Sequence, residues 1–261
     1  AVVWLGNSLN FCYWTPEAQP MWSIEIAGEW EADAFAQFGM LNAAFANGHD
    51  LNDAKVLKSD IFTSLFANGK GFLPLIDQRI GILREIGKVL EKNYGGRLEN
   101  AILAAGKDAL THAGFLATTF PSFNDARILD ESFVPLRKRA QLAAGMLHAA
   151  RLARGAEGLS NPEQLTVYAD YMLPVALRSL GVMKLTHQLS EKISAQQWLE
   201  AGSREETEIR VVTVAACDIL IEKVQQNGAT LDAPRLDFWL WKKGLDKQSK
   251  IPHHRTLTTD Y

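Results

Sequence analysis

The residue in this sequence best suited to chemistry is a carboxylate beside two tyrosines. Asp170 lies between Tyr168 and Tyr171, four residues before Pro174. Because proline has no N–H, the carbonyl of Asp170 cannot accept its usual helical hydrogen bond, so a helix arriving here must break or kink. We therefore expect Asp170 at a junction between two helical pieces, held ionised near a developing positive charge. The alternative is an Asp that caps a helix beside two packed tyrosines.

A lysine on a long predicted helix is the second candidate. Lys138 stands between Arg137 and Arg139 on the helix predicted for Val134–Arg154, and Gln141 lies one turn further on. Three consecutive cations cannot share one direction on a helix, so at least one faces the interior or a cleft. Such a lysine would meet an acid or a phosphate. The alternative is a solvated basic turn.

Two further acids border apolar sequence. Glu208 belongs to the helix predicted for Ser203–Gln226, which opens with a capping box, and it adjoins a face rich in Ile and Val. A carboxylate at such a border is either paired or bound to a ligand. Asp237 precedes the aromatic run Phe238–Trp241, although it can equally interact with the helix dipole.

Aromatic residues gather near the N-terminus beside an asparagine. The segment Leu9–Trp14 contains Asn10, Phe11 and Trp14. Aromatic rings can stack on a planar heterocycle while Asn or Asp bonds along its edge. Plain core packing is the competing explanation for such a cluster.

The histidines and cysteines indicate no metal site. His253, His254 and Arg255 could bind an anion, but the six histidines form no HExxH or HxH pattern. Cys12 and Cys217 are the only cysteines, so we expect no disulfide and a reducing compartment. No phosphate-binding loop, dinucleotide fingerprint or serine-hydrolase elbow is present, and we expect no cofactor.

Composition excludes several classes of protein. The chain has 261 residues and a net charge of -3, which argues against a protein that lives on nucleic-acid phosphates. No apolar run could span a bilayer and no signal-peptide pattern is present, so we expect a cytoplasmic protein without membrane contact. The chain begins at Ala1 without methionine, and we expect a further segment before it.

Periodicity predicts one mostly α domain over residues 1–261. Trp22–Trp30 alternates around Ala27-Gly28 and predicts a short β-hairpin, with irregular sequence in the rest of residues 1–32 and in the tail from Ile251. A helical run begins at Asn161-Pro162. The other predicted helices are Ala34–Ala46, Asn52–Ala67, Pro74–Asn93, Asn100–Ala104, Asp108–Thr118, Val134–Arg154, Val175–Leu180, Lys184–Ile193, Ser203–Gln226 and Ala233–Lys243.

Seven motifs occur in a fixed order along nearly the whole chain. They are Leu9–Trp14, Phe120–Phe123, Lys138–Gln141, Tyr168–Pro174, Glu208–Arg210, Leu236–Trp241 and His254-Arg255 followed by Tyr261. Each motif is weak, but the ordered combination resembles the queuosine salvage protein family of queuosine 5′-phosphate N-glycosylase/hydrolases. That resemblance implies a mainly α fold similar to that of the helix-hairpin-helix DNA glycosylases, in a glycosidase domain whose N-terminal helical part is missing here.

The resemblance also implies an activity, which is hydrolysis of the N-glycosidic bond of queuosine 5′-monophosphate to release queuine. We find no convincing glycine-bearing DNA-binding hairpin, so a free nucleotide is favoured over nucleic acid. A carboxylate such as Asp170 would stabilise the oxocarbenium-like transition state and activate water. Lys138 would orient Asp170 or contact ribose or phosphate.

The same resemblance assigns the substrate contacts. The candidates are Asn10, Phe11, Trp14 and Tyr171 for the base, Glu208 and Asp237 for the ammonium and diol of queuine, and His254 and Arg255 beside Lys138 for the phosphate. The alternative from a different class is a non-catalytic helical module that binds a nucleobase or a protein partner.

Overall fold

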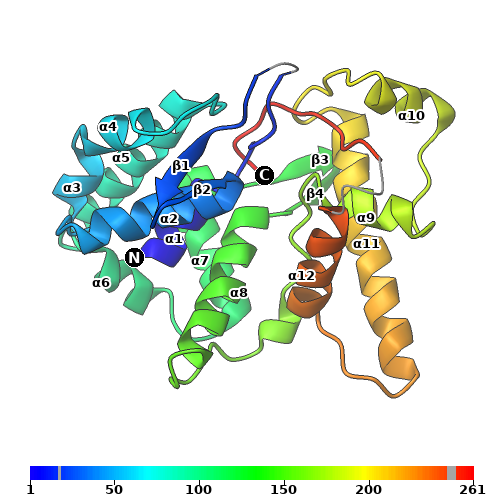
Figure 1. Cartoon of the computed structure of the whole chain (residues 1–261). Helices are drawn as coiled ribbons and strands as arrows, with labels where there is room; N and C mark the ends of the chain where they lie inside the picture. The colour runs from blue at the N-terminus through cyan, green and yellow to red at the C-terminus, as the bar shows by residue number, and fades with distance from the viewer. Residues whose placement is uncertain (17–18, 246–250) are drawn as a thin grey trace.

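The computed structural model describes residues 1–16, 19–245 and 251–261, and most of these residues are helical. They form twelve α-helices, two short 3₁₀ turns and two two-stranded sheets. In Figure 1 the N-terminal and C-terminal helices lie on opposite sides of α7 and α8. The prediction of a mainly α protein is confirmed, whereas the likeness to helix-hairpin-helix DNA glycosylases stays a prediction.

The elements follow one another in three groups. The N-terminal group is α1 (Val2–Ser8), β1 (Ser23–Ile26), β2 (Glu29–Ala32), α2 (Asp33–Ala46), α3 (Ala54–Lys58), α4 (Ile61–Ala67), α5 (Ile76–Asn93) and α6 (Leu98–Ala104). The central group is α7 (Ala109–Thr119), η1 (Pro121–Phe123), β3 (Arg127–Leu129), β4 (Ser132–Val134) and α8 (Lys138–Leu152). The C-terminal group is η2 (Pro162–Gln164), α9 (Leu173–Ser179), α10 (His187–Ser194), α11 (Arg204–Gln226) and α12 (Ala233–Gly244).

The hairpin near the N-terminus confirms the sequence prediction. Strands β1 and β2 pair antiparallel around Ala27 and Gly28, whose φ angles are 52° and 89°. Positive φ at both central residues matches the twist that a two-residue hairpin turn requires. A second hairpin, β3–β4, was not predicted, because Asp130 and Glu131 take positive φ at its turn without any glycine to signal it.

Three predicted boundaries differ from the structure. Asn52–Ala67 forms two helices, α3 and α4, because Ser59 is extended between them. The helix expected from Val134 begins only at Lys138, since Val134 pairs with Arg127 in the second sheet. Helix α1 lies in a segment that was expected to be irregular.

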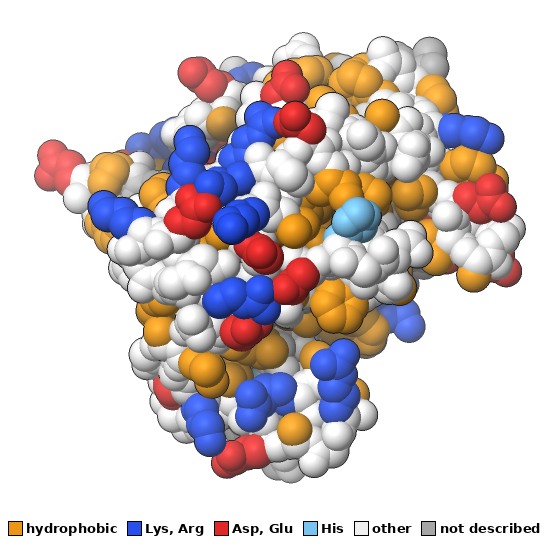
Figure 2. Space-filling view, turned by 90° about the vertical axis from the view of Figure 1, so that its left-hand side faces the viewer, with side chains coloured by type: hydrophobic (Ala, Val, Ile, Leu, Met, Phe, Trp, Pro, Cys, Tyr) orange, Lys and Arg blue, Asp and Glu red, His pale blue; other side chains and the backbone are white. Residues whose placement is uncertain are grey.

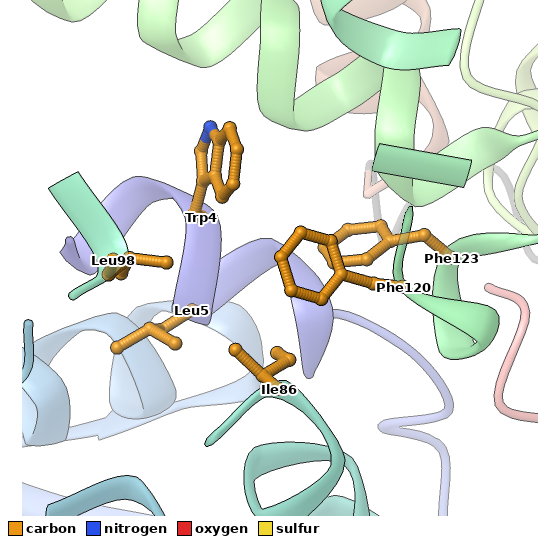
Figure 3. Close-up of a pocket in the computed structure, with 6 residues that line it drawn as sticks. All are labelled: Trp4, Leu5, Ile86, Leu98, Phe120 and Phe123. Carbon is orange, nitrogen blue, oxygen red and sulfur yellow. The ribbon is translucent and has the colours of Figure 1, made fainter. Parts of the chain in front are cut away.

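Apolar side chains from α1, α5 and α6 meet the segment after α7 in the interior (Figure 3). The gap among Trp4, Leu5, Ile86, Leu98, Phe120 and Phe123 has no room for a water molecule. The indole nitrogen of Trp4 donates to Nε2 of His112 at 3.0 Å, so its polar atom is satisfied. This gap is therefore core packing.

Charged side chains of both signs are interspersed on the face shown in Figure 2. Arg84 of α5 pairs with Asp60 beside α4 at 2.7 Å, and Arg97 pairs with Asp50 at 2.7 Å. The charges on this side of the molecule therefore balance locally. Among the described residues, no helix is both long and apolar enough to cross a membrane.

The C-terminal segment returns across the molecule to the segment after α1 (Figure 1). The amide of Cys12 donates to the main-chain oxygen of Tyr261 at 2.9 Å. On the way, the carbonyl of Arg255 accepts from the amide of Leu199 at 2.8 Å. Residues from the two ends of the sequence are thereby brought to one place.

Candidate active site

A cavity of about 240 Å³ lies where these segments meet. Its walls come from the segment after α1, the start of α2, the first residue of α8, the segment before α9, α12 and the C-terminal segment. The lining residues are Asn10, Phe11, Tyr13, Trp14, Met21, Asp33, Ala34, Lys138, Asp170, Tyr171, Met172, Trp241, Leu245, His253 and Tyr261. The structure thus brings together six of the ten predicted site residues, namely Asn10, Phe11, Trp14, Lys138, Asp170 and Tyr171.

Asp170 is half-buried in the cavity wall and anchored through one carboxylate oxygen. Its Oδ1 accepts hydrogen bonds from the amides of Met172 at 2.7 Å and Leu173 at 3.2 Å. These bonds satisfy amides at the start of α9, which would otherwise be orphaned. No described residue hydrogen-bonds to Oδ2, so that oxygen can meet a ligand. Asp170 is therefore a helix cap and a cavity carboxylate at once.

The prediction of a helix before Asp170 is wrong. The sequence from Asn161-Pro162 forms only the 3₁₀ turn η2 and then continues without regular structure. Side chains take the place of helical carbonyls along this stretch: the amide of Thr166 donates to Oε1 of Gln141 at 2.8 Å. Asp170 consequently lies at the beginning of α9, and not at a junction between two helices.

Lys138 is buried, with only 4 % of its surface exposed. Its Nζ donates to the main-chain carbonyl of Asn10 at 3.1 Å. Burial lowers the pKa of the Lys138 ammonium, and the negative charges of Asp170 and Asp237 oppose that shift. The alternative of a solvated basic turn is wrong for this residue. Lys138, which lines the cavity, therefore belongs to the same charge cluster as Asp170.

Buried cations hold every carbonyl of the segment Ser8–Cys12. Arg139 donates to Ser8, Arg79 to Leu9, Phe11 and Cys12, and Lys138 to Asn10. The guanidinium carbons of Arg79 and Arg139 also lie 4.2 and 5.1 Å from the ring centre of Phe11. Charge-assisted hydrogen bonds of this kind are stronger than neutral ones. They fix the wall that carries Asn10 and Phe11.

Asp237 lies behind the cavity wall. Its side chain is 8 % exposed, and Oδ1 accepts from the amide of Tyr168 at 2.7 Å. Burial, with the negative charge of Asp170, raises the pKa of Asp237 well above its ordinary value, while Lys138 opposes the shift. Asp237 is therefore not among the described residues that line the cavity, although its charge acts on Lys138, which does line it.

Glu208 is not brought to the cavity. Its side chain is 44 % exposed and pairs with Arg204 at 2.6 Å. Two residues along the same helix, Arg210 is fully buried and binds Asp125 through both terminal nitrogens. Residues two apart on a helix point in nearly opposite directions, so only one of this pair can face inward. The buried charged residue of the motif Glu208–Arg210 is therefore the arginine.

The C-terminal histidines divide between the cavity and the core. His253 lines the cavity, with its ring centre 4.9 Å from that of Tyr171. His254 is 2 % exposed and lies behind the wall, with Nε2 3.1 Å from the Tyr261 hydroxyl. Burial lowers the pKa of His254 to about 3, so it carries no charge for an anion at neutral pH. The expected phosphate contact from His254 is therefore unsupported.

Arg255 is the remaining predicted cation. It does not line the cavity, but its guanidinium carbon is 5.7 Å from the ring centre of Trp14, which does. Trp14 also meets the ring of Trp198 edge-on, at 5.1 Å between centres. Arg255 is thus near the rim of the cavity.

Sequence reasoning missed several lining residues. Tyr13, Trp241 and Tyr261 fall inside motifs that the sequence analysis singled out, so their presence could have been anticipated. Asp33 gave no signal, since it stands at the start of an ordinary helix far from the other motifs. Among the described residues, no three His, Cys, Asp or Glu side chains are grouped to hold a metal ion.

The family model and the related proteins that match this chain all carry names from queuosine salvage. The family described as queuosine salvage protein matches residues 2–261. A Sphaerobacter thermophilus protein named queuosine 5′-phosphate N-glycosylase/hydrolase is 34% identical over 259 residues, covering 98% of this chain and 79% of that protein. Proteins of the same name from Dictyostelium discoideum and Mus musculus are 32% and 26% identical, covering 98% and 99% of this chain and 76% and 81% of theirs.

Proposed function

Because the chain belongs to the queuosine salvage protein family, we propose that it hydrolyses the N-glycosidic bond of queuosine 5′-monophosphate and releases queuine. One observation carries the proposal at the level of residues. Asp170 lines a cavity together with a buried lysine and several aromatic rings, and its Oδ2 atom accepts no hydrogen bond from any residue that the structure describes. These are the groups that cleavage of a bond between ribose and a planar base requires.

In the proposed reaction, the bond between ribose C1′ and the base nitrogen breaks and positive charge develops at C1′. The Oδ2 atom of Asp170 stabilises this charge and accepts a proton from the attacking water, whose oxygen bonds to C1′. The departing base takes up a proton from solvent at an edge atom other than N7, which a 7-deazaguanine lacks, and Asp170 returns the proton that it accepted to solvent. The products are queuine and ribose 5-phosphate.

The surrounding residues support that chemistry. The Lys138 ammonium and the Asp170 carboxylate attract each other, because opposite charges interact strongly in a poorly solvated site. We propose that the base stacks on the rings of Tyr171 and His253, while Phe11, whose ring contacts Arg79 and Arg139, lines the same cavity. Arg255 and Lys138 are the cations we propose for the 5′-phosphate.

We propose further that residues 1–261 act as one glycosidase domain, since both ends of the chain supply the cavity wall. A free nucleotide, and not nucleic acid, is the proposed substrate. The two free, buried cysteines, Cys12 and Cys217, support work in a reducing compartment such as the cytoplasm.

The decisive experiment incubates the purified chain with queuosine 5′-monophosphate in the presence of EDTA. Chromatography then measures how much queuine is released. Turnover by the wild type and its loss in Asp170→Asn are expected. A non-catalytic base-binding module would instead bind queuine, by calorimetry, without releasing it from the nucleotide. Cleavage that needs a specific divalent ion would overturn the metal-free mechanism.

A further inference from the structure

A second carboxylate faces the cavity without a partner. Asp33 is the first residue of α2 and lines the cavity together with Asp170. It is half-buried, and it makes no hydrogen bond or ion pair with any residue that the structure describes. Burial raises the pKa of Asp33, and no cation among the residues that the structure describes opposes that shift. A partly buried carboxylate left in this state requires a positive or hydrogen-bonding partner.

The other charged groups of the wall are already engaged. Asp170 caps α9 through Oδ1, and Lys138 donates to the carbonyl of Asn10. The negative charges of Asp170 and Asp237 oppose the lowering of the Lys138 pKa by burial. Tyr171 lines the same cavity, and burial, followed by the negative charges of Asp170 and Asp33, raises the pKa of its phenol. Asp33 is therefore a separate negative site within the same cavity.

The backbone at Asp33 is also unusual. Its φ is 56°, a left-handed conformation that costs free energy in residues other than glycine. Such strain persists where surrounding structure enforces it, and it is often found at ligand sites. Here it starts α2 with the carboxylate at the cavity and with Ala34 beside it in the wall.

The proposed substrate contains one cation. Queuine carries a secondary ammonium on a side chain that is attached to the five-membered ring of the base. One ring atom separates the point of attachment from the glycosidic nitrogen. We propose, on the basis of the proposed function, that Asp33 binds this ammonium and makes the site selective for 7-deazaguanines with a cationic side chain. Apolar and aromatic residues such as Met21 and Trp241 line the same cavity, and a poorly solvated cavity strengthens the attraction between opposite charges.

The test compares two substrates in one variant. Asp33→Asn should lower kcat/KM for queuosine 5′-monophosphate by roughly 10- to 100-fold, the effect of losing one charge-assisted hydrogen bond. It should leave kcat/KM for 7-deazaguanosine 5′-monophosphate, which has no cation, within about twofold of the wild type. Because Asn tolerates left-handed φ nearly as well as Asp, the variant should keep the fold.

A matched control shows whether the effect of Asp33→Asn comes from losing a charge in the cavity or from losing a charge at the start of a helix. Asp77 stands in the first turn of α5, is exposed and is not among the residues that line the cavity. Asp77→Asn should therefore leave kcat/KM unchanged for both substrates. An equal loss on both substrates in Asp33→Asn would make Asp33 a structural residue and overturn the inference. Unchanged kinetics on both would overturn it as well.

Binding of the free base distinguishes this inference from the proposed function. Queuine and 7-deazaguanine are titrated into the wild type and into Asp33→Asn by calorimetry. If the wild type releases no queuine from the nucleotide but prefers queuine to 7-deazaguanine in an Asp33-dependent way, the proposed function fails and the inference stands. If the wild type binds both bases equally, the inference fails whatever the outcome of the release assay.

Discussion

The Nε atom of Arg210 donates a hydrogen bond to the main-chain carbonyl of Ala169, at 3.1 Å and immediately before Asp170. The two terminal nitrogens of the same guanidinium bind the carboxylate of Asp125 at 2.9 and 2.5 Å. That carboxylate also accepts the amide of Lys138 at 3.1 Å. One buried guanidinium therefore connects the backbone segments of both proposed catalytic residues.

Arg210→Lys should lower kcat by about tenfold or more while KM changes less. Lysine keeps the charge but cannot reproduce the planar fork that binds Asp125 and Ala169 together. The segments that carry Asp170 and Lys138 would then shift, and small misplacements are costly to catalysis. Steady-state kinetics measure kcat and KM at a temperature below the melting temperature of the variant. Circular dichroism at the same temperature checks that the variant is folded.

The control for Arg210→Lys is Arg204→Lys on the exposed face of the same helix. It should leave kcat unchanged. If Arg210→Lys retains the wild-type kcat, or if it raises KM alone, the proposed positioning role is excluded.

Asp170→Asn should reduce kcat by about 10²–10³ or more, as expected for loss of electrostatic stabilisation at a charged transition state. The fold should survive, because the amide oxygen of Asn can still accept from Met172 and Leu173 at the start of α9. Single-turnover release of queuine and a thermal melt would measure the two effects. Near-wild-type turnover in this variant would exclude Asp170 as the catalytic carboxylate.

The sequence predicted most helices because their ends carry local signals. Ser203 accepts from the amide of Glu206 at 3.3 Å, as its capping motif requires. The segment before Asp170 was mispredicted because its backbone pairs with side chains that are distant in sequence, Gln141 and Asp237. No local pattern reveals such partners.

The site was predictable to the extent that its residues fall in recognisable motifs. Asp170 and Lys138 were found in this way, and both line the cavity. Glu208 was proposed as a substrate contact because it adjoins hydrophobic residues, but these neighbours do not reveal which side of the helix turns inward, and the Glu208 side chain is exposed and paired with Arg204. Asp33 could not be found at all, since only the tertiary fold brings the start of α2 to the cavity.

Arg255→Gln should lower kcat/KM for queuosine 5′-monophosphate by about tenfold and leave kcat/KM for the nucleoside unchanged. The reason is the loss of one charge-assisted contact to phosphate near Trp14. Both substrates are assayed at fixed ionic strength, because exposed charge interactions weaken with salt. Arg235→Gln, which removes an exposed arginine on α12, is the control. An equal effect on nucleotide and nucleoside would exclude a phosphate contact.

Asp237→Asn should stabilise the protein increasingly as pH rises. In the unfolded chain this carboxyl ionises near pH 4. In the folded protein its pKa is raised well above that value by burial and by Asp170. Between the two pKa values the native state binds more protons than the unfolded state, so this group makes the free energy of unfolding fall as pH rises.

Asn cannot ionise, yet its side-chain oxygen can still accept from the amide of Tyr168. The free energy of unfolding of Asp237→Asn minus that of the wild type should therefore increase with pH, by at most about 1.4 kcal/mol per pH unit. Urea denaturation at intervals between pH 4.5 and about 8 measures this difference, with Asp77→Asn as the control for losing an exposed carboxylate. A difference that stays constant across this range would mean that Asp237 ionises alike in the folded and unfolded chains. A difference that decreases with pH would mean that Lys138 holds Asp237 ionised in the native state, in which case the raised pKa is wrong.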